Sequence, residues 1–253
     1  MSLRDLILKR IAQQGPINLA DYMSECLLHP TYGYYTTQSP FGAEGDFITA
    51  PEISQMFGEL VGLCLAQAWM DQSCPAPFTL AELGPGRGTM MADILRATRG
   101  IVGFHDAAQI TLVEASPRLI TLQNQTLHPH VATHVTTAQN LPEAPLFLIA
   151  NEFIDALPTR QFSRGQHHWS ETHVGAQDGK LVLGLGPELP QPALADRFRD
   201  TEPGDVVEYA PAVSLIMEAI GGRIARHGGA GLIIDYGGWR SLGDTFQALR
   251  AHK

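Results

Sequence analysis

Residues 82–89 read Glu-Leu-Gly-Pro-Gly-Arg-Gly-Thr, and this short stretch decides the fold. An apolar run at 78–83, FTLAEL, precedes the glycines and predicts a β-strand. The pattern of residues 89–98 predicts a helix directly after them. Glycines allow the backbone to turn sharply and to approach a ligand closely. A strand, a glycine-rich turn and a helix in this order are typical of a nucleotide-binding loop.

The spacing of the glycines separates three kinds of loop. A phosphate-binding loop of the GxxxxGK[ST] kind is excluded, because no lysine followed by serine or threonine stands here. A dinucleotide-binding loop, GxGxxG, requires a glycine where this chain has Thr89. The observed pattern is ExGxGxG, which resembles the first motif of class I S-adenosylmethionine-dependent methyltransferases. The carboxylate of Glu82 suits a ligand with ammonium and sulfonium groups, whereas it would repel a pyrophosphate. The loop residues expected to bind this cofactor are Glu82, Gly84, Pro85, Gly86 and Gly88.

The segments after the loop continue to alternate between strand and helix. Further apolar strands are predicted at 109–115, 134–138, 146–150 and 231–237, with helices at 117–127 and 211–227. Such alternation implies a mainly parallel, twisted sheet with helices on both faces. The predicted fold class is therefore α/β, and the resemblance of the glycine motif implies a Rossmann-like class I methyltransferase fold.

Two additions accompany this pattern. Helices predicted at 2–13 and 18–28 form an N-terminal appendage, and a loop rich in glycine, proline and tyrosine follows them. A polar insertion at about 159–208 contains two strand patterns joined by Ala-Gln-Asp-Gly, which predicts a β-hairpin. We expect two domains, with the N-terminal helices and a lid loop in 1–72 and the methyltransferase domain with its insertion in 73–253.

The stretch GDFITAPE is the expected lid over the cofactor. Thr49 and Glu52 fit a capping box, and a helix is expected from 51 to 71. Because a helix N-terminus favours a carboxylate ligand, Asp46 and Thr49 are candidate cofactor contacts. Capping alone would also account for Thr49 and Glu52.

Two later strand ends supply further candidate cofactor contacts. Glu114 ends the second strand, where an acid accepts hydrogen bonds from ribose hydroxyls in both methyltransferases and dehydrogenases. Gln139 and Asn140 follow the third strand, where many methyltransferases place an acid that binds the adenine amino group. An amide carbonyl could make the same contact.

The fourth strand ends in the candidate catalytic residues. Its apolar residues run directly into Asn151 and Glu152, and Asp155 follows. This position is at the carboxyl edge of the sheet, where ligands of such folds bind. Two carboxylates can hold a cationic substrate group and accept a released proton, and the Asn151 carbonyl could orient a nitrogen. Asp155 could instead cap a helix or turn that begins here.

Composition excludes several classes of partner. The 253 residues carry a formal net charge of −9 and no stripe of lysine and arginine, which argues against nucleic acid. No apolar run reaches the roughly 20 residues of a membrane span, so no membrane insertion is expected. Cys26, Cys64 and Cys74 lack metal-ligand spacing, and no metal site is predicted.

Several stretches together resemble the MidA family of class I methyltransferases, which includes the mitochondrial complex I assembly protein arginine methyltransferase. These stretches are HPTYGYY (29–35), GDFITAPEISQMFGE (45–59), AELGPGRGT (81–89), ANEFIDALPTRQF (150–162), IIDYG (233–237) and GDTFQALRAH (243–252). The resemblance implies S-adenosyl-L-methionine as cofactor and a protein substrate that bears an arginine, of the respiratory-complex type. It also implies a cytoplasmic location for a bacterial-type chain, or the mitochondrial matrix for a eukaryotic one. Family members continue beyond the last stretch, so the final edge of the sheet is expected outside this sequence.

Two other functions are compatible with parts of this sequence. An NAD(P)-binding oxidoreductase shares the fold, but the ExGxGxG spacing argues against it. A non-catalytic assembly factor could keep the fold, bind S-adenosylmethionine and contact a partner through its insertion.

Overall fold

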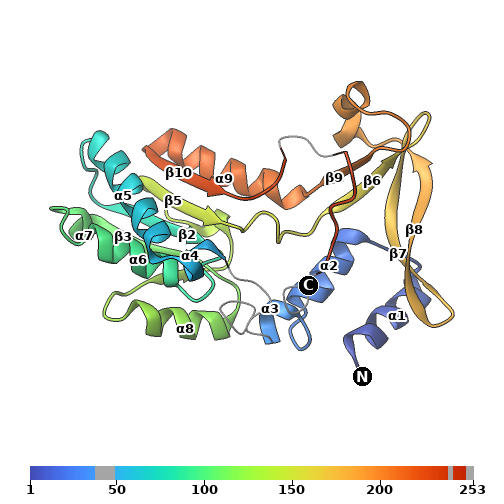
Figure 1. The fold of residues 1–253 in the computed structure, drawn as a ribbon, viewed down its shortest axis with the longest axis horizontal. Helices are drawn as coiled ribbons and strands as arrows, with labels where there is room; N and C mark the ends of the chain where they lie inside the picture. Colours follow the sequence, from blue (N-terminus) through green and yellow to red (C-terminus); the bar gives the residue numbers. More distant parts are fainter. Residues whose placement is uncertain (38–48, 239–241, 249–253) are drawn as a thin grey trace. The chain divides into compact units, whose positions relative to one another are not determined.

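The structure, a computed structural model, describes residues 1–37, 49–238 and 242–248. Contacts within the chain divide it into two compact units (Figure 1). Unit 1 comprises Met1–Gln38, Leu157–Ala212 and Gly237–Leu249, and unit 2 comprises Ser39–Ala156, Val213–Tyr236 and Arg250–Lys253. These units do not follow the expected division after residue 72, because the insertion groups with the N-terminal helices.

Unit 2 contains a five-stranded parallel sheet, as the strand pattern predicts. The strands lie in the order β10-β5-β2-β3-β4, and every neighbouring pair is parallel. They are β2 (Phe78–Leu83), β3 (Ala108–Val113), β4 (Thr133–Val135), β5 (Leu146–Asn151) and β10 (Gly229–Ile234). The chain order reverses between β2 and β5, which is where ligands bind in open α/β sheets.

Helices cover both faces of this sheet. They are α4 (Ala50–Ile53), α5 (Gln55–Asp71), α6 (Thr89–Thr98), α7 (Phe104–Ala107), α8 (Pro117–Leu127), the 3₁₀ turn η1 (Ala138–Asn140) and α9 (Pro211–His227). Alternate strand residues point to opposite faces. Phe147 and Ile149 pack in the core with α5 and α6, whereas Leu146 and Leu148 pack with Ile220 of α9. The α/β fold with two covered faces is confirmed.

Unit 1 contains an antiparallel sheet and the N-terminal helices. Its elements are α1 (Leu3–Gln14), β1 (Ile17–Asn18), α2 (Leu19–Leu28), α3 (Tyr34–Thr37), β6 (Arg160–Arg164), β7 (Trp169–Gln177), β8 (Lys180–Leu189), the 3₁₀ helix η2 (Pro192–Arg199) and β9 (Val206–Tyr209). The predicted hairpin is confirmed as β7 and β8, joined by Asp178 and Gly179, both at positive φ. Strands β6 and β9 extend this sheet and lack a clear alternating pattern.

Two local predictions were wrong. The helix expected over 51–71 is interrupted at Ser54, whose backbone is extended, so α4 and α5 are separate. The capping box fails because the Thr49 side chain makes no cap bond, while the Glu52 carboxylate binds Arg87 and Thr89 instead. Within the described ranges, no helix is long and apolar enough to cross a bilayer.

Candidate functional site

The glycine loop connects β2 to α6 in a conformation that depends on glycine. Gly84, Gly86 and Gly88 have φ values of 61°, 52° and 81°, a region that side chains with a Cβ rarely adopt. A Cβ on Gly84 would lie 2.7 Å from a ring carbon of Phe153, in the turn after β5. The loop backbone therefore packs directly against that turn, and larger residues at position 84 would separate them.

Glu82 lies near the end of β2, and one of its carboxylate oxygens makes no hydrogen bond to the described residues. The residue is 2% exposed, and its Oε2 atom has no hydrogen-bond partner among the described residues. Burial raises the pKa of this carboxyl to about 8, against a bond from the Met91 backbone that lowers it. A buried carboxyl with a free oxygen fits a ligand that brings a cation or an N–H donor. The residues present here thus fit the ammonium group of S-adenosylmethionine.

Glu114 lies at the end of β3, where burial raises the pKa of its carboxyl. Its Oε1 accepts a 2.8 Å bond from the Ser116 backbone, and its Oε2 accepts a 3.2 Å bond from Gln123 Nε2. Gln123 also donates to the Gly86 carbonyl at 2.9 Å, so one buried amide joins the glycine loop to Glu114. Sequence reasoning missed Gln123, although it shares the buried face of α8 with residues four positions on either side.

Gln139 and Asn140 lie on η1, and both side chains are exposed. Gln139 Nε2 donates to the Leu215 carbonyl at 3.3 Å, and Asn140 Oδ1 accepts a bond from the Thr137 hydroxyl. Each amide therefore already has a protein partner, so an adenine contact by either one stays a prediction.

Helix α4 lies against the glycine loop. Glu52 accepts a 2.8 Å bond from Thr89 Oγ1 and a 3.3 Å bond from Arg87. The backbone N–H of Ala50, the first residue of α4, donates to the Glu152 carboxylate. Helix α4 thus contacts both the glycine loop and the turn after β5. Thr49 precedes this helix, and Asp46 lies outside the described residues.

Asn151 and Glu152 stand where β5 ends. Glu152 has a φ of 48°, uncommon for a residue with a side chain, and its N–H donates to the Ile234 carbonyl at 2.8 Å. The Asn151 side chain also hydrogen-bonds the Glu152 carboxylate. Partial desolvation raises the pKa of Glu152, and the neighbouring carboxylates of Asp155 and Asp235 raise it further.

Asp155 lies in the same turn and caps no helix, since none begins at residues 152–156. Its carboxylate does accept a bond from the Ala156 backbone N–H, within the turn. Asp235, which directly follows the adjacent strand β10, accepts bonds from the backbone N–H groups of Ile154 and Asp155. Desolvation and the charge of Asp235 raise the pKa of Asp155. The Tyr236 hydroxyl donates to Asp155 Oδ2 at 2.7 Å. Sequence reasoning did not single out Tyr236, and its only signal was the stretch IIDYG.

The three carboxylates of Glu152, Asp155 and Asp235 form an acidic cluster. Across the part of the chain that the structure describes, none of them forms an ion pair with lysine, arginine or histidine. The same described residues contain no group of His, Cys, Asp and Glu suited to hold a metal ion.

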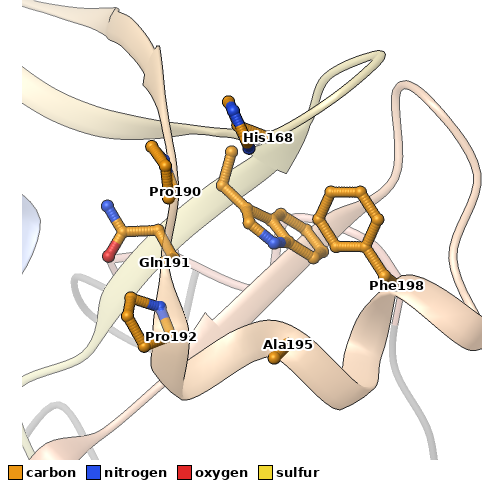
Figure 2. Close-up of a pocket in the computed structure, with 7 residues that line it drawn as sticks. His168, Pro190, Gln191, Pro192, Ala195 and Phe198 are labelled. Atoms are coloured by element: carbon orange, nitrogen blue, oxygen red, sulfur yellow. The ribbon is translucent and has the colours of Figure 1, made fainter.

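A separate pocket of about 300 Å³ lies in unit 1 (Figure 2). It is lined mainly by apolar and proline side chains: His168, Trp169, Pro190, Gln191, Pro192, Ala195 and Phe198. None of the predicted site residues lines it. The pocket lacks the carboxylates and glycine backbone that a cationic nucleoside needs, so the candidate site is the one in unit 2.

Comparison with known proteins finds relatives of this chain. The chain is 37% identical over 279 residues to the mitochondrial protein arginine methyltransferase NDUFAF7 of Xenopus tropicalis, covering 99% of this chain and 64% of the relative. It is 37% identical over 278 residues to the human protein of that name, covering 99% of this chain and 62% of the relative. The chain thus spans less than two thirds of the length of these relatives.

A solved structure shares the fold. A crystal structure of a protein from Burkholderia thailandensis bound to S-adenosyl-homocysteine superposes with a TM-score of 0.76 at 28% identity, covering 93% of this chain and 62% of that one. Residues 60–253 match the family model described as "Putative S-adenosyl-L-methionine-dependent methyltransferase". On this match, and on the glycine loop and strand order described above, the chain belongs to the MidA family of S-adenosylmethionine-dependent methyltransferases.

Proposed function

We propose that this chain transfers a methyl group from S-adenosyl-L-methionine to an arginine side chain of a protein. The observation that carries the proposal is the acidic cluster after β5 and β10, which has no basic partner among the described residues. Guanidinium is charged at any working pH, so it supplies the missing positive charge. The names of the relatives, protein arginine methyltransferases, support the same substrate class.

The cofactor residues in this proposal surround the glycine loop. S-adenosylmethionine, when bound, supplies a methyl group on a positively charged sulfur. The free oxygen of Glu82 accepts a bond from the ligand, and the Glu114 carboxylate accepts from its ribose. Gly84, Pro85, Gly86 and Gly88 supply a backbone that leaves room for it. Contacts by Gln139, Asn140, Asp46 and Thr49 remain predictions.

The catalytic residues hold and orient the substrate. Glu152 and Asp155 bind the guanidinium by charge-assisted hydrogen bonds, and Asn151 keeps the Glu152 carboxylate in place. Correct orientation of two reactants can lower a barrier by about 7–11 kcal/mol, which is the main task in methyl transfer. A carboxylate with a raised pKa is also a better acceptor for the proton that the product releases.

The family resemblance also suggests a particular kind of protein substrate and a cellular location. We propose a substrate of the respiratory-complex type, as the resemblance to the complex I assembly methyltransferase implies. The relatives named above are mitochondrial proteins. Those names support a mitochondrial location for a eukaryotic chain and lend no support to a cytoplasmic one.

A labelled-methyl transfer assay tests this proposal. The chain is incubated with methyl-labelled S-adenosylmethionine and cell lysate, and the labelled species are identified by mass spectrometry. We expect label on protein arginine, and at least a tenfold loss in Glu152→Gln and in Asp155→Asn with unchanged cofactor affinity in calorimetry. Label only in a small molecule would overturn the substrate class, and full activity in both variants would overturn the catalytic roles.

Calorimetry also separates the alternative functions. Binding of S-adenosylmethionine without binding of NADH would exclude the oxidoreductase. Cofactor binding without methyl transfer to any lysate component would favour the non-catalytic assembly factor.

A further inference from the structure

Asp235 follows β10 and holds the turn after β5 through its side chain. Its Oδ2 atom accepts bonds from the backbone N–H groups of Ile154 and Asp155, both at 3.1 Å. Its Oδ1 atom accepts a bond from the Tyr236 backbone at 3.0 Å. The turn forms no helix of its own, and Asp235 supplies an acceptor for these two amides from elsewhere in the sequence. The Asp235 side chain therefore links β10 to the backbone that carries Asp155.

The register of the sheet explains why these residues meet. Ile234, the last residue of β10, pairs with Asn151, the last residue of β5, in parallel register. The segments that follow both strands therefore leave the sheet at the same edge. The bond from the Glu152 N–H to the Ile234 carbonyl extends this pairing by one residue. Asp235 is the first residue after β10, so its side chain can reach the turn after β5.

Tyr236 contacts the turn through its phenol. Its hydroxyl donates to Asp155 Oδ2 at 2.7 Å, a length typical of a bond to a charged acceptor. This bond and partial desolvation raise the pKa of Tyr236, so the phenol stays a donor at any working pH. Tyr236 is 66% exposed and buries little apolar surface. Loss of its hydroxyl should therefore affect the orientation of Asp155 more than the stability of the fold.

We propose that Asp235 and Tyr236 are positioning residues for methyl transfer. Asp235 holds the backbone of the turn, and Tyr236 sets the orientation of the Asp155 carboxylate toward the substrate guanidinium. This inference rests on the proposed function, because it assigns Asp155 a role in holding the substrate. Neither residue needs to touch the methyl donor.

Tyr236→Phe tests the role of the phenol. The full chain is assayed with a fixed amount of lysate protein while methyl-labelled S-adenosylmethionine and pH are varied. We expect kcat to fall roughly tenfold while KM for the cofactor stays unchanged, because a hydrogen bond to a charged group is lost away from the cofactor loop. Tyr209→Phe, which removes the same oxygen from a residue of unit 1, should leave both values unchanged.

The pH profile distinguishes orientation from a purely structural role. The groups that face Asp155 are Glu152, Asp235 and Tyr236. The bond from Tyr236 favours the ionised form of Asp155 and so lowers its pKa. Without that bond, the acid limb of the rate profile should move to higher pH, whereas a structural defect would lower the rate at every pH.

Two substitutions at Asp235 test the acceptor. Asp235→Asn keeps an oxygen for the two amides and should retain most of kcat, whereas Asp235→Ala should lower kcat at least tenfold with unchanged cofactor affinity. If the alanine variant does not fold, the kcat of Tyr236→Phe still tests the inference. If the wild type methylates arginine and both Tyr236→Phe and Asp235→Ala keep its kcat, the positioning roles are wrong and the proposed function stands. A wild type that binds S-adenosylmethionine but methylates no arginine would overturn the proposed function, and this inference with it.

Discussion

The glycine loop and the turn after β5 lie at the same edge of one sheet, but different forces hold them. The loop obtains its shape from its own residues, since Gly84, Gly86 and Gly88 occupy positive φ and Gly88 donates to the Pro85 carbonyl at 2.7 Å. The turn obtains its shape from β10, whose Asp235 accepts its amides across about 80 residues of sequence. A conformation set by neighbouring residues can be recognised in a sequence motif. Hydrogen bonds between residues distant in sequence can be recognised only once the pairing of the strands is known.

The largest expected effect comes from Gly84→Ala, which acts on both regions. The new Cβ would lie 2.7 Å from a ring carbon of Phe153, and the alanine would have to adopt a φ of 61°. Strain of this kind costs on the order of 1–3 kcal/mol, so we expect the Kd for S-adenosylmethionine to rise roughly tenfold to hundredfold in calorimetry. Gly100→Ala is the control, because nothing lies within 4 Å of its added Cβ. Unchanged affinity in Gly84→Ala would show that the loop tolerates separation from the turn.

A second prediction uses the pKa of Glu82, which burial raises to about 8. A carboxyl whose pKa is higher in the folded than in the unfolded state favours the neutral form, so the ligand-free protein loses stability as pH rises toward 8. A cationic ligand requires the ionised form, and its affinity should therefore rise by up to about tenfold per pH unit below 8. The measurement is the increase in Tm that saturating S-adenosylmethionine produces at several pH values.

The matched variant for this prediction is Glu82→Gln, which cannot titrate. Its Tm increase with cofactor should be smaller and nearly independent of pH. The same pH dependence in wild type and Glu82→Gln would mean that another group couples to the ligand, and the role of Glu82 would then be structural.

The smallest expected effect comes from Glu52→Gln, which weakens the contact between α4 and the glycine loop. The variant loses the charge that binds Arg87, an ion pair in which the arginine is 48% exposed. Because exposed pairs contribute at most about 1 kcal/mol, the Kd for S-adenosylmethionine should rise only about threefold. Glu25→Gln removes a comparable pair with Arg10 in unit 1 and should leave the Kd unchanged. A tenfold or larger rise would mean that α4 contacts the cofactor directly.

Local patterns predicted most elements of unit 2 closely. The helices at 89–98 and 117–127 and the strand at 78–83 agree with the structure to the residue. Apolar strands and helices of this length are determined by periodicity, which neighbouring residues already contain. The break at Ser54 has no such periodic signal, and the bonds of Glu52 to Arg87 and Thr89 join segments more than 30 residues apart in sequence.

The candidate site was predicted unevenly for the same reason. The glycines, Glu82 and the acids after β5 stand in motifs, and the sequence alone predicts them as site residues. Gln123 and Tyr236 were not, because each acts on a residue distant in sequence: Gln123 on the Gly86 carbonyl, Tyr236 on Asp155. A hydrogen bond between distant side chains leaves no periodic signal in either segment.

By itself, the sequence determined the class of this protein: an α/β methyltransferase fold with a glycine-rich loop after the first strand of its parallel sheet and a pair of carboxylates after the fourth. Periodicity and glycine spacing involve only neighbouring residues, so they can be recognised in the sequence alone. Only the tertiary structure decided that Asp155 caps no helix, that Asp235 holds its turn and that the Tyr236 phenol binds its carboxylate. The physical reason is the parallel pairing of β5 and β10, which brings two segments far apart in sequence to one edge of the sheet.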